Sequence, residues 1–394
     1  MTVAAGFHAA SGIDRIVLRS GTYRVSEAER TWERIRPVLP MLGITRIADI
    51  TDLEDFGIPT HTGLRPTGAT VAVSMGMAID PAQSRVSAAM ESIEAWHAEN
   101  PGVAPVARGS AHDVGLPYDV RSLNLAAGSL LTEHTVLDWV AGTGLLTGTR
   151  MLVPADLILL DSVRQRTLAL ALFVPTSNGN ACGNSVTEAA LHGLLELVER
   201  DCISDLVERS AVDRIGVDPD SSTNETTGQV VAALHRTGCR IELMDITNPV
   251  GVPCYSGRIW ADGYPANYGG FGCHLDPQIA AGRALGEAMQ SRLAAVAGAR
   301  DDIVLAAYDE RPAAPPPDFS FGSVVPIRPR PAGLPDSASA ALGWLAERVR
   351  RHTGVEPFAV DLSRPEVGVP AVKVFAPGLR LFPLDGLSFA DGEA

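Results

Sequence analysis

Apolar positions follow two spacings along this chain, and each spacing predicts a different kind of element. Repeats of three and four residues predict amphipathic helices, and short apolar runs predict strands. Helices are expected within 81–94, 185–201, 230–238, 277–293 and 342–354, and strands within 44–50, 151–160, 167–175, 240–246 and 358–362. Because helices and strands are interspersed in no single regular order, the pattern predicts an α+β (mixed α/β) fold with helices packed against sheets.

A strand, a turn and a second strand recur three times in this pattern. Each unit follows a glycine suited to a helix end, its first strand ends near an aspartate, and a Gly-x-Pro tripeptide precedes the second strand. The aspartates are Asp49, Asp245 and Asp361, and the tripeptides begin at Gly57, Gly251 and Gly368. The recurrence predicts related strand pairs in different parts of one fold.

Three of the predicted helices share one arrangement of polar side chains. A residue suited to a helix start is followed eleven residues later by an oxygen-bearing side chain, and three residues further on by another. The sets are Asp80 with Glu91 and Glu94, Ser185 with Glu196 and Glu199, and Asp276 with Glu287 and Gln290. Residues three apart lie on one helix face, so three such faces directed to one point would form a pocket suited to Mg²⁺. The alternative is a solvated acidic face, but Ser, Ala and Met surround the first pair where such a face usually has Lys or Arg.

Two of these helices belong to a longer internal repeat. A shift of 196 residues places 76–81 on 272–277, Asp49 on Asp245, Glu91 on Glu287, and Glu94 on Gln290. The same offset recurs at both ends of the stretch from Asp49 to Glu94, which indicates a duplicated unit better than a chance match.

The central helix carries the longest polar stripe. Its members are Glu188, His192, Glu196 and Glu199, at spacings of four, four and three residues. Ser185 and Glu188 form a capping box, so a structural role is the alternative for Glu188. The Asn- and Gly-rich turn at 177–184 offers N–H groups that suit phosphate, and a purely structural loop is its alternative.

Other polar residues near these helices have open roles. The position of Arg283 is equally compatible with binding a phosphate group and with an ion pair to a glutamate. His192 and His274 have no His-xxx-His or CxxC partner nearby, which favours packing or hydrogen bonding over zinc binding.

Composition narrows the classes of function. The 394 residues are 46% hydrophobic and 20% charged, which is typical of a globular protein with a sizeable core. The net charge of −14 argues against nucleic-acid binding. No apolar run is long enough to cross a bilayer and the N-terminus lacks a signal-peptide pattern, so we expect a cytoplasmic protein without a membrane partner. The five cysteines lack a metal-type CxxC pair and are expected to be reduced thiols.

Lys373 is the only lysine of the chain. A P-loop needs a Gly-Lys-Ser/Thr sequence, and a protein kinase or a Schiff-base enzyme also needs a dedicated lysine. An ATP site in this chain would therefore work without a P-loop lysine. A Pro-rich connector at 311–335 is expected either as a linker or as a long ordered excursion.

Four segments resemble the YcaO family. They are SxxxExxE at 87–94, SNGNACGNSVTEAALHGLLELVERD at 177–201, GFGCHLDPQIAAGRALGEAMQSRL at 270–293 and VPAVKVFAPGL at 369–379. The resemblance covers the chain from about Ser74 onward. The N-terminal region and residues 298–302 resemble the branch of the family that works with a TfuA partner.

The resemblance implies a YcaO-type fold with internally repeated strand-strand-helix units and an ATP site among three helices. It implies a YcaO domain at 67–394 and an N-terminal unit of helix and strands at 1–66 packed on it. The cofactors implied are ATP and Mg²⁺. The metal ligands carried over from the family are Glu91, Glu94, Glu196, Glu199 and Glu287. The nucleotide-binding residues carried over are Ser87, Glu91, Asn184, Glu188, Arg200, Arg283 and Gln290.

The implied activity is ATP-dependent O-phosphorylation of a backbone amide in a ribosomally made peptide. Attack by a sulfur nucleophile would then install a thioamide with a TfuA-like partner, and a homodimer is implied as well. One alternative is an azoline-forming cyclodehydratase acting on Cys, Ser or Thr, although the Pro-x-Pro-x-Pro tail common in such members is missing. Another is a non-catalytic nucleotide-binding accessory protein, because Met77 and Ala95 stand where the family often has Lys and Arg.

Overall fold

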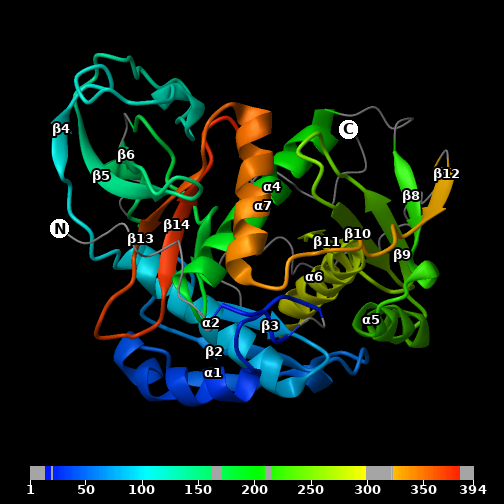
Figure 1. Cartoon of the computed structure of the whole chain (residues 1–394). Coiled ribbons are helices and arrows are strands. Elements are labelled where there is room, and N and C mark those ends of the chain that lie inside the picture. Colours follow the sequence, from blue (N-terminus) through cyan, green and yellow to red (C-terminus); the bar gives the residue numbers. More distant parts are fainter. Residues whose placement is uncertain are drawn as a thin grey trace.

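The computed structural model describes residues 14–18, 21–161, 171–208, 214–298, 321 and 323–381. In this part of the chain, helices and three sheets form the mixed α+β fold that the sequence predicts (Figure 1). The α-helices are α1 (Ala28–Ile35), α2 (Pro81–Glu99), α4 (Val186–Glu208), α5 (Glu225–Arg236), α6 (Pro277–Ala297) and α7 (Ala338–Thr353). Short 3₁₀ helices are η1 (Arg36–Leu42), η2 (Thr51–Leu53), η3 (Val120–Ser122), η4 (Ala155–Leu157) and η6 (Pro219–Ser221).

Two of the sheets contain the duplicated unit. The first has the order β1-β2-β3, and the second has the order β11-β10-β9-β8-β12. Their strands are β1 (Arg46–Asp49), β2 (Thr60–Leu64), β3 (Val73–Met77), β8 (Ile215–Asp218), β9 (Arg240–Asp245), β10 (Cys254–Trp260), β11 (Tyr268–Cys273) and β12 (Ser323–Pro326). Neighbouring strands are antiparallel except β8 and β12, which are parallel.

The duplicated units keep the same register. Thr60 pairs with Met77 between β2 and β3, and Cys254 pairs with Cys273 at the matching place between β10 and β11. Each unit continues into a long helix, α2 after β3 and α6 after β11. The strand-strand-helix repeat predicted from the sequence is therefore confirmed.

The third sheet has the order β4-β5-β13-β14-β7, and β6 pairs with β5 along residues 139–143. Its strands are β4 (Ala107–Gly109), β5 (Leu137–Gly144), β6 (Arg150–Pro154), β7 (Asn180–Cys182), β13 (Phe358–Asp361) and β14 (Ala371–Phe375). It contains the third predicted strand pair, β13 and β14, which follows α7. Helix α4 begins directly after β7, so all three helices with the shared frame follow a strand.

The caps of these helices match the sequence prediction. The side chain of Asp80 accepts a hydrogen bond from Ala82 N (3.1 Å), and Asp276 accepts one from Gln278 N (3.0 Å). Ser185 Oγ accepts from Glu188 N (3.1 Å) at the start of α4. These caps satisfy N–H groups that have no partner inside the helix, and they place the later glutamates at a constant distance from each helix start.

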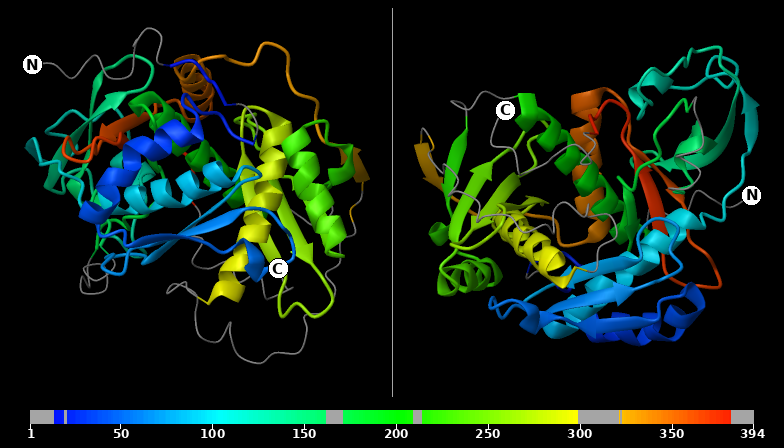
Figure 2. Two further views of the ribbon diagram at one scale, coloured as in Figure 1. Left: turned by 90° about the horizontal axis from the view of Figure 1, so that it is seen from below. Right: turned by 180° about the vertical axis from the view of Figure 1, so that it is seen from behind.

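Helix α4 lies at the centre of the molecule (Figures 1 and 2). It packs beside α7, against β14 on one side and against β11 on another. The apolar side of α4 is completely buried, with Leu194 and Val198 fully inaccessible to solvent. This packing holds the polar stripe of α4 between the other two helices of the frame.

Some of the expected strands differ from the observed ones. The strand expected at 151–160 ends at Pro154, where η4 begins. Of the strand expected at 167–175, residues 167–170 lie outside the described residues, and Phe173 makes only an isolated bridge with Leu125. The sequence prediction of full strands there was wrong in extent, because apolar runs alone do not specify whether a neighbouring strand is available for pairing.

The structure tests only part of what the sequence predicts about the Pro-rich connector and the domain boundary. In the Pro-rich connector, residues 311–320 and 322 lie outside the described residues, whereas Ser323–Pro326 forms the edge strand β12 beside β8. The boundary between 66 and 67 stays a prediction; β2 before it and β3 after it pair in one sheet. Among the described residues, no helix combines the length and the apolarity that a membrane span requires.

Candidate functional site

The structure brings the three helical pairs together in one ring of hydrogen bonds. The first residue of each pair accepts a backbone hydrogen bond from the segment that leads into its own helix. The contacts are Glu91 Oε2 with Met75 N (3.2 Å), Glu196 Oε2 with Gly179 N (3.0 Å) and Glu287 Oε2 with Phe271 N (3.0 Å). The donors lie in β3 for α2 and in β11 for α6, and Gly179 lies directly before β7 for α4.

The second residue of each pair reaches the strand of the next unit. Glu94 Oε2 accepts from Cys182 N (3.2 Å) in β7, and Glu199 Oε2 accepts from Cys273 N (3.1 Å) in β11. Gln290 Nε2 donates to Met75 O (3.3 Å) in β3. The sequence of contacts runs from α2 to β7, from α4 to β11 and from α6 to β3, so it closes on itself with approximate threefold symmetry.

Gln290 is where the symmetry breaks. A carboxylate there would accept from an N–H, as its two counterparts do, but the Gln290 amide donates to a carbonyl instead. The ring thus contains five carboxylates and one neutral amide. Fewer negative charges lie near α6 than near α2 and α4.

Crowding of the carboxylates changes their acidity. Burial raises the pKa of Glu94 well above its ordinary value, and the charges of Glu196 and Glu91 raise it further. Burial also raises the pKa of Glu287 to about 7, with Glu199 as the next cause. Such a cluster of negative groups stabilises a bound cation, which would relieve the repulsion between them.

The donor set fits Mg²⁺ held together with phosphate. One oxygen of each glutamate in the ring binds a backbone N–H, which orients the other oxygen. Among the described residues, however, no three acidic or histidine side chains approach closely enough to hold an ion by themselves. Mg²⁺ usually takes one or two carboxylates and completes its shell with water and substrate phosphates, which matches carboxylates spread over three helices.

The predicted site residues differ in exposure. Ser87, Glu91, Arg283 and Glu287 are exposed and Glu188 and Glu199 are buried, whereas the others are half-buried: Glu94, Asn184, Glu196, Arg200 and Gln290. The side chain of Glu287 thus reaches solvent although the surrounding protein raises its pKa. A ligand could reach the exposed group without displacing the core.

Arg200 supplies positive charge to the ring. Its guanidinium lies 3.2 Å from Glu199 Oε1 and 3.5 Å from Glu196 Oε1. Its Nε donates to Asn178 Oδ1 (3.3 Å) in the Asn- and Gly-rich turn. Arg200 therefore links two carboxylates of the ring to the turn that precedes α4.

Glu188 and Asn184 both bind the N-terminal segment. Glu188 Oε2 accepts from Val25 N (2.8 Å), and its Oε1 accepts from Asn184 N (3.1 Å). Asn184 Oδ1 accepts from Thr31 Oγ1 and from Arg34 Nη2, both at 2.8 Å. Of the capping box, the Ser185 half forms, but Glu188 reaches the residue before Ser185. The nucleotide-binding roles expected for Asn184 and Glu188 stay predictions.

Two arginines and two histidines lie near the starts of α4 and α6. Burial, followed by the charges of Arg24 and Arg283, lowers the pKa of both His192 and His274 well below the ordinary value. His274 Nδ1 accepts from Asp276 N (3.0 Å), and its ring meets Tyr23 edge-on at 4.4 Å. The prediction of a packing and hydrogen-bonding role for His274 is confirmed.

Sequence reasoning did not place Arg24 and Lys373 in the site. Arg24 comes from the N-terminal segment, and Arg283 and Glu188 are among the charges that act on it. Lys373 lies on β14, where Glu196 and Glu94 act on its ammonium group. Lys373 had one signal in the sequence, since it is the only lysine, whereas Arg24 had none.

Comparison with known proteins identifies the family. Residues 75–380 match the family described as YcaO cyclodehydratase, which binds ATP and Mg²⁺. An uncharacterised protein of Mycobacterium tuberculosis is 34% identical over 383 residues, which are 93% of this chain and 84% of that protein. An uncharacterised protein of Rhizobium leguminosarum bv. trifolii, described by its position in the tfuA 3′ region, is 32% identical over 381 residues, covering 89% of this chain and 87% of its own.

Solved structures agree with the fold. YcaO from Methanopyrus kandleri bound with AMPPCP and Mg²⁺ has a TM-score of 0.70 at 24% identity, and the match covers 93% of this chain and 94% of that one. A heterocyclase in complex with substrate and cofactor has a TM-score of 0.72 at 21% identity. That match covers 94% of this chain, which spans 55% of the heterocyclase. The chain belongs to the YcaO family, and its cofactors are ATP and Mg²⁺.

Proposed function

We propose that this protein uses ATP and Mg²⁺ to phosphorylate a backbone amide oxygen of a ribosomally made peptide, and that the product is a thioamide. The ring of five carboxylates across α2, α4 and α6 is the observation that carries the proposal. It offers oriented oxygens for Mg²⁺ in the described part of a chain whose family binds ATP.

An amide needs activation because its carbonyl carbon is a poor electrophile and its oxygen is a poor leaving group. The amide oxygen forms a bond to the γ-phosphorus as the bond to ADP breaks. A hydrosulfide-equivalent nucleophile then adds to the carbon, and inorganic phosphate leaves with the original oxygen. The protein must align oxygen with phosphorus and balance negative charge, which is what catalysis of phosphoryl transfer mostly requires.

The residues divide this work between them. Glu91, Glu94, Glu196, Glu199 and Glu287 would hold Mg²⁺, which when bound neutralises phosphate charge. Arg200 and Arg283 would balance the remaining charge on the triphosphate. Ser87, which is exposed on α2, and Gln290, whose amide is neutral, would contact the nucleotide.

The thioamide proposal is supported by the relative from the tfuA 3′ region, at 32% identity. A TfuA-like protein would deliver the sulfur. The azoline-forming alternative is supported by the fold shared with a heterocyclase. Peptide mass separates them, since exchange of oxygen for sulfur adds about 16 mass units and cyclodehydration removes about 18.

Replacement of one carboxylate tests the metal assignment. E199Q should lower ATP hydrolysis about 100-fold or more, because it removes a charged group from the site that stabilises the transferring phosphoryl group. E347Q is the matched control, since Glu347 on α7 pairs only with Arg350 and Arg351 among the described residues. Near-normal hydrolysis by E199Q would refute the assignment. No hydrolysis by the wild type with any peptide and TfuA-like partner would favour the accessory-protein alternative.

A further inference from the structure

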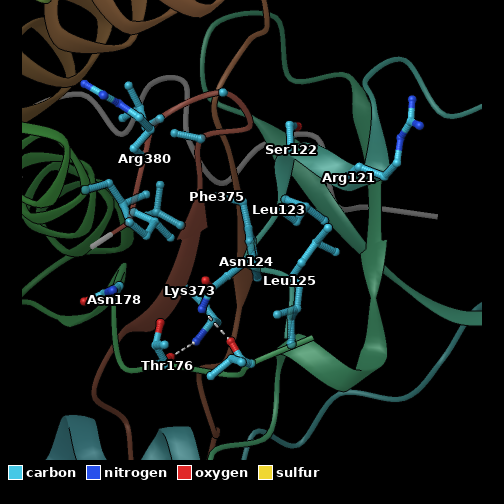
Figure 3. A pocket seen from close by; sticks show the side chains of 18 residues that line it. Arg121, Ser122, Leu123, Asn124, Leu125, Thr176, Asn178, Lys373, Phe375 and Arg380 are labelled. Atoms are coloured by element: carbon cyan, nitrogen blue, oxygen red, sulfur yellow. Dashed lines mark hydrogen bonds between the residues drawn. The ribbon is translucent and has the colours of Figure 1, made fainter. Parts of the chain in front are cut away.

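A pocket of about 450 Å³ lies beside the carboxylate ring. It is formed by β14 and the residues that follow it, the segments 121–125 and 174–178, and Leu197 of α4 (Figure 3). Its apolar lining includes Leu123, Leu125, Leu157, Val174, Leu197 and Phe375. This volume is in the range of sites for small ligands, and the lining suits an uncharged group.

The arginines at this pocket are already paired. Arg121 lies 3.0 Å from Asp119, and Arg380 pairs with Asp201 (3.7 Å) and with Asp205. Their charges are therefore balanced by neighbouring carboxylates. An acidic group in the pocket would compete with these existing ion pairs and gain little from them.

Lys373 lies between the pocket and the carboxylate ring. Its Nζ donates to Thr176 O (2.5 Å), a contact drawn in Figure 3. The side chain lines the pocket, and on its other side Glu196 and Glu94 attract its ammonium group. Asn178 makes a second connection, because it lines the pocket and accepts a hydrogen bond from Arg200 (3.3 Å).

Asn180 adds unused hydrogen-bonding groups beside Lys373. The two residues are direct partners in the pairing of β14 with β7, so their side chains project from the same face of the sheet. Both are buried, at 3% exposure for Lys373 and 4% for Asn180. Among the described residues, neither Oδ1 nor Nδ2 of Asn180 has a hydrogen-bond partner. Buried polar atoms without partners are costly, although Asn180 is not itself among the residues that line the pocket.

We propose that this pocket binds the apolar side chain next to the amide that is modified, and that Lys373 holds the peptide backbone there. The ammonium group donates to a peptide carbonyl. The proposal rests on the function proposed above, and it assigns the substrate a neutral, apolar residue at this position. Lys373 is a binding residue in this scheme.

Two capped tripeptides serve as probes of the pocket. N-acetyl-Leu-Gly-Leu amide and N-acetyl-Asp-Gly-Asp amide are titrated into the full chain with and without Mg²⁺ and AMPPCP, and binding is followed by ligand-observed NMR. The leucine probe should bind measurably and the aspartate probe at least about tenfold more weakly, because a charged group loses hydration in an apolar pocket. Failure of the leucine probe to bind the wild type at millimolar concentration would overturn the proposal.

Substitutions in and outside the pocket show whether the leucine probe binds there. V174W fills the pocket from a side chain that is 40% exposed, and L130W is the matched control on a residue that is 78% exposed and outside the lining. V174W should abolish binding of the leucine probe, and L130W should leave it unchanged. K373M should weaken it about 10- to 100-fold, the range expected for a hydrogen bond from a charged donor, and K373R should recover part of the loss.

AMPPCP affinity, probe affinity and ATP hydrolysis together distinguish a failure of this proposal from a failure of the proposed function. AMPPCP affinity should stay within about twofold of the wild type in V174W, because Val174 lines the pocket and no nucleotide or metal contact is assigned to it. An equal loss of AMPPCP and probe affinity in V174W would overturn the assignment of the pocket to the peptide. If the probe binds as expected but no peptide stimulates ATP hydrolysis, the proposed function fails and the pocket assignment stands.

Discussion

At the scale of single residues, each carboxylate of the ring has a different electrostatic environment. Glu287 has a pKa of about 7, from burial first and from Glu199 second. Glu199 is partly balanced by Arg200 at 3.2 Å. On α6, Gln290 replaces a charge with an amide. The ring is therefore asymmetric in charge although its backbone contacts repeat.

The pKa of Glu287 predicts a pH dependence of metal binding. If Glu287 holds Mg²⁺ as proposed, the metal would bind its ionised carboxylate, so a proton would compete with the metal below about pH 7. Apparent Mg²⁺ affinity in the presence of AMPPCP should fall about tenfold per pH unit below that value and level off above it. Calorimetry should also detect clear proton release on binding at pH 6 and little at pH 8, after subtraction of a titration without protein. An affinity unchanged between these pH values would contradict the assignment.

At the scale of elements, the duplicated units depend on glycines that let a strand pass close to a helix. A methyl group at Gly76 would overlap the backbone of α2 at Ser84 and Ala88. Gly272 lies 196 residues after Gly76, and a methyl group there would overlap the backbone of α6 at Ala280 and Ala284, which lie 196 residues after Ser84 and Ala88. The same contact, kept in both copies, sets the distance between strand and helix and so lets each glutamate reach its backbone N–H.

Substitution of one such glycine tests this packing. Gly272→Ala should destabilise the protein by about 1–3 kcal/mol, because the added methyl group meets helix backbone that cannot move away easily. Gly343→Ala in α7 is the control, since nothing lies within 4 Å of a methyl group there. The control should be neutral or up to about 1 kcal/mol stabilising, because alanine favours helix more than glycine does. Denaturant unfolding measures both changes, and equal effects would contradict the steric explanation.

At the scale of the whole molecule, the ring ties three separate parts of the chain together. Glu94 joins α2 to β7, Glu199 joins α4 to β11, and Gln290 joins α6 to β3. The first and second sheets and the strand before α4 thus meet at one place. A ligand that binds there holds all of them at once.

Binding should therefore stabilise the three parts together. Mg²⁺ with AMPPCP at 100 times its Kd should raise the free energy of unfolding by about 2.7 kcal/mol. Hydrogen exchange should slow in β3, β7 and β11 in the same experiment, because the N–H groups of these strands are bonded to the ring. AMPPCP without Mg²⁺ is the comparison. Protection confined to one of the three strands would show that the ring does not act as a unit.

The sequence by itself determined the helix starts, the spacing of the glutamate pairs and the strand-strand-helix duplication. These are local patterns: a cap residue, a helical period and a repeated offset can all be read without knowing what lies nearby. The local signal was weaker for strands: in the described part of the strand expected at 167–175, residues 171–175 show only an isolated bridge at Phe173.

Only the tertiary structure decided which strand the second residue of each helical pair reaches. It likewise decided that Glu188 anchors the N-terminal segment through Val25. It also decided that Lys373 and Asn180 share one sheet face beside the ring, since their pairing joins residues 193 positions apart. Contacts of this kind depend on how sheets and helices pack, and no local pattern encodes them. The chemistry of the carboxylates was visible in the sequence, whereas their order around the ring and the pocket beside it follow from the packing.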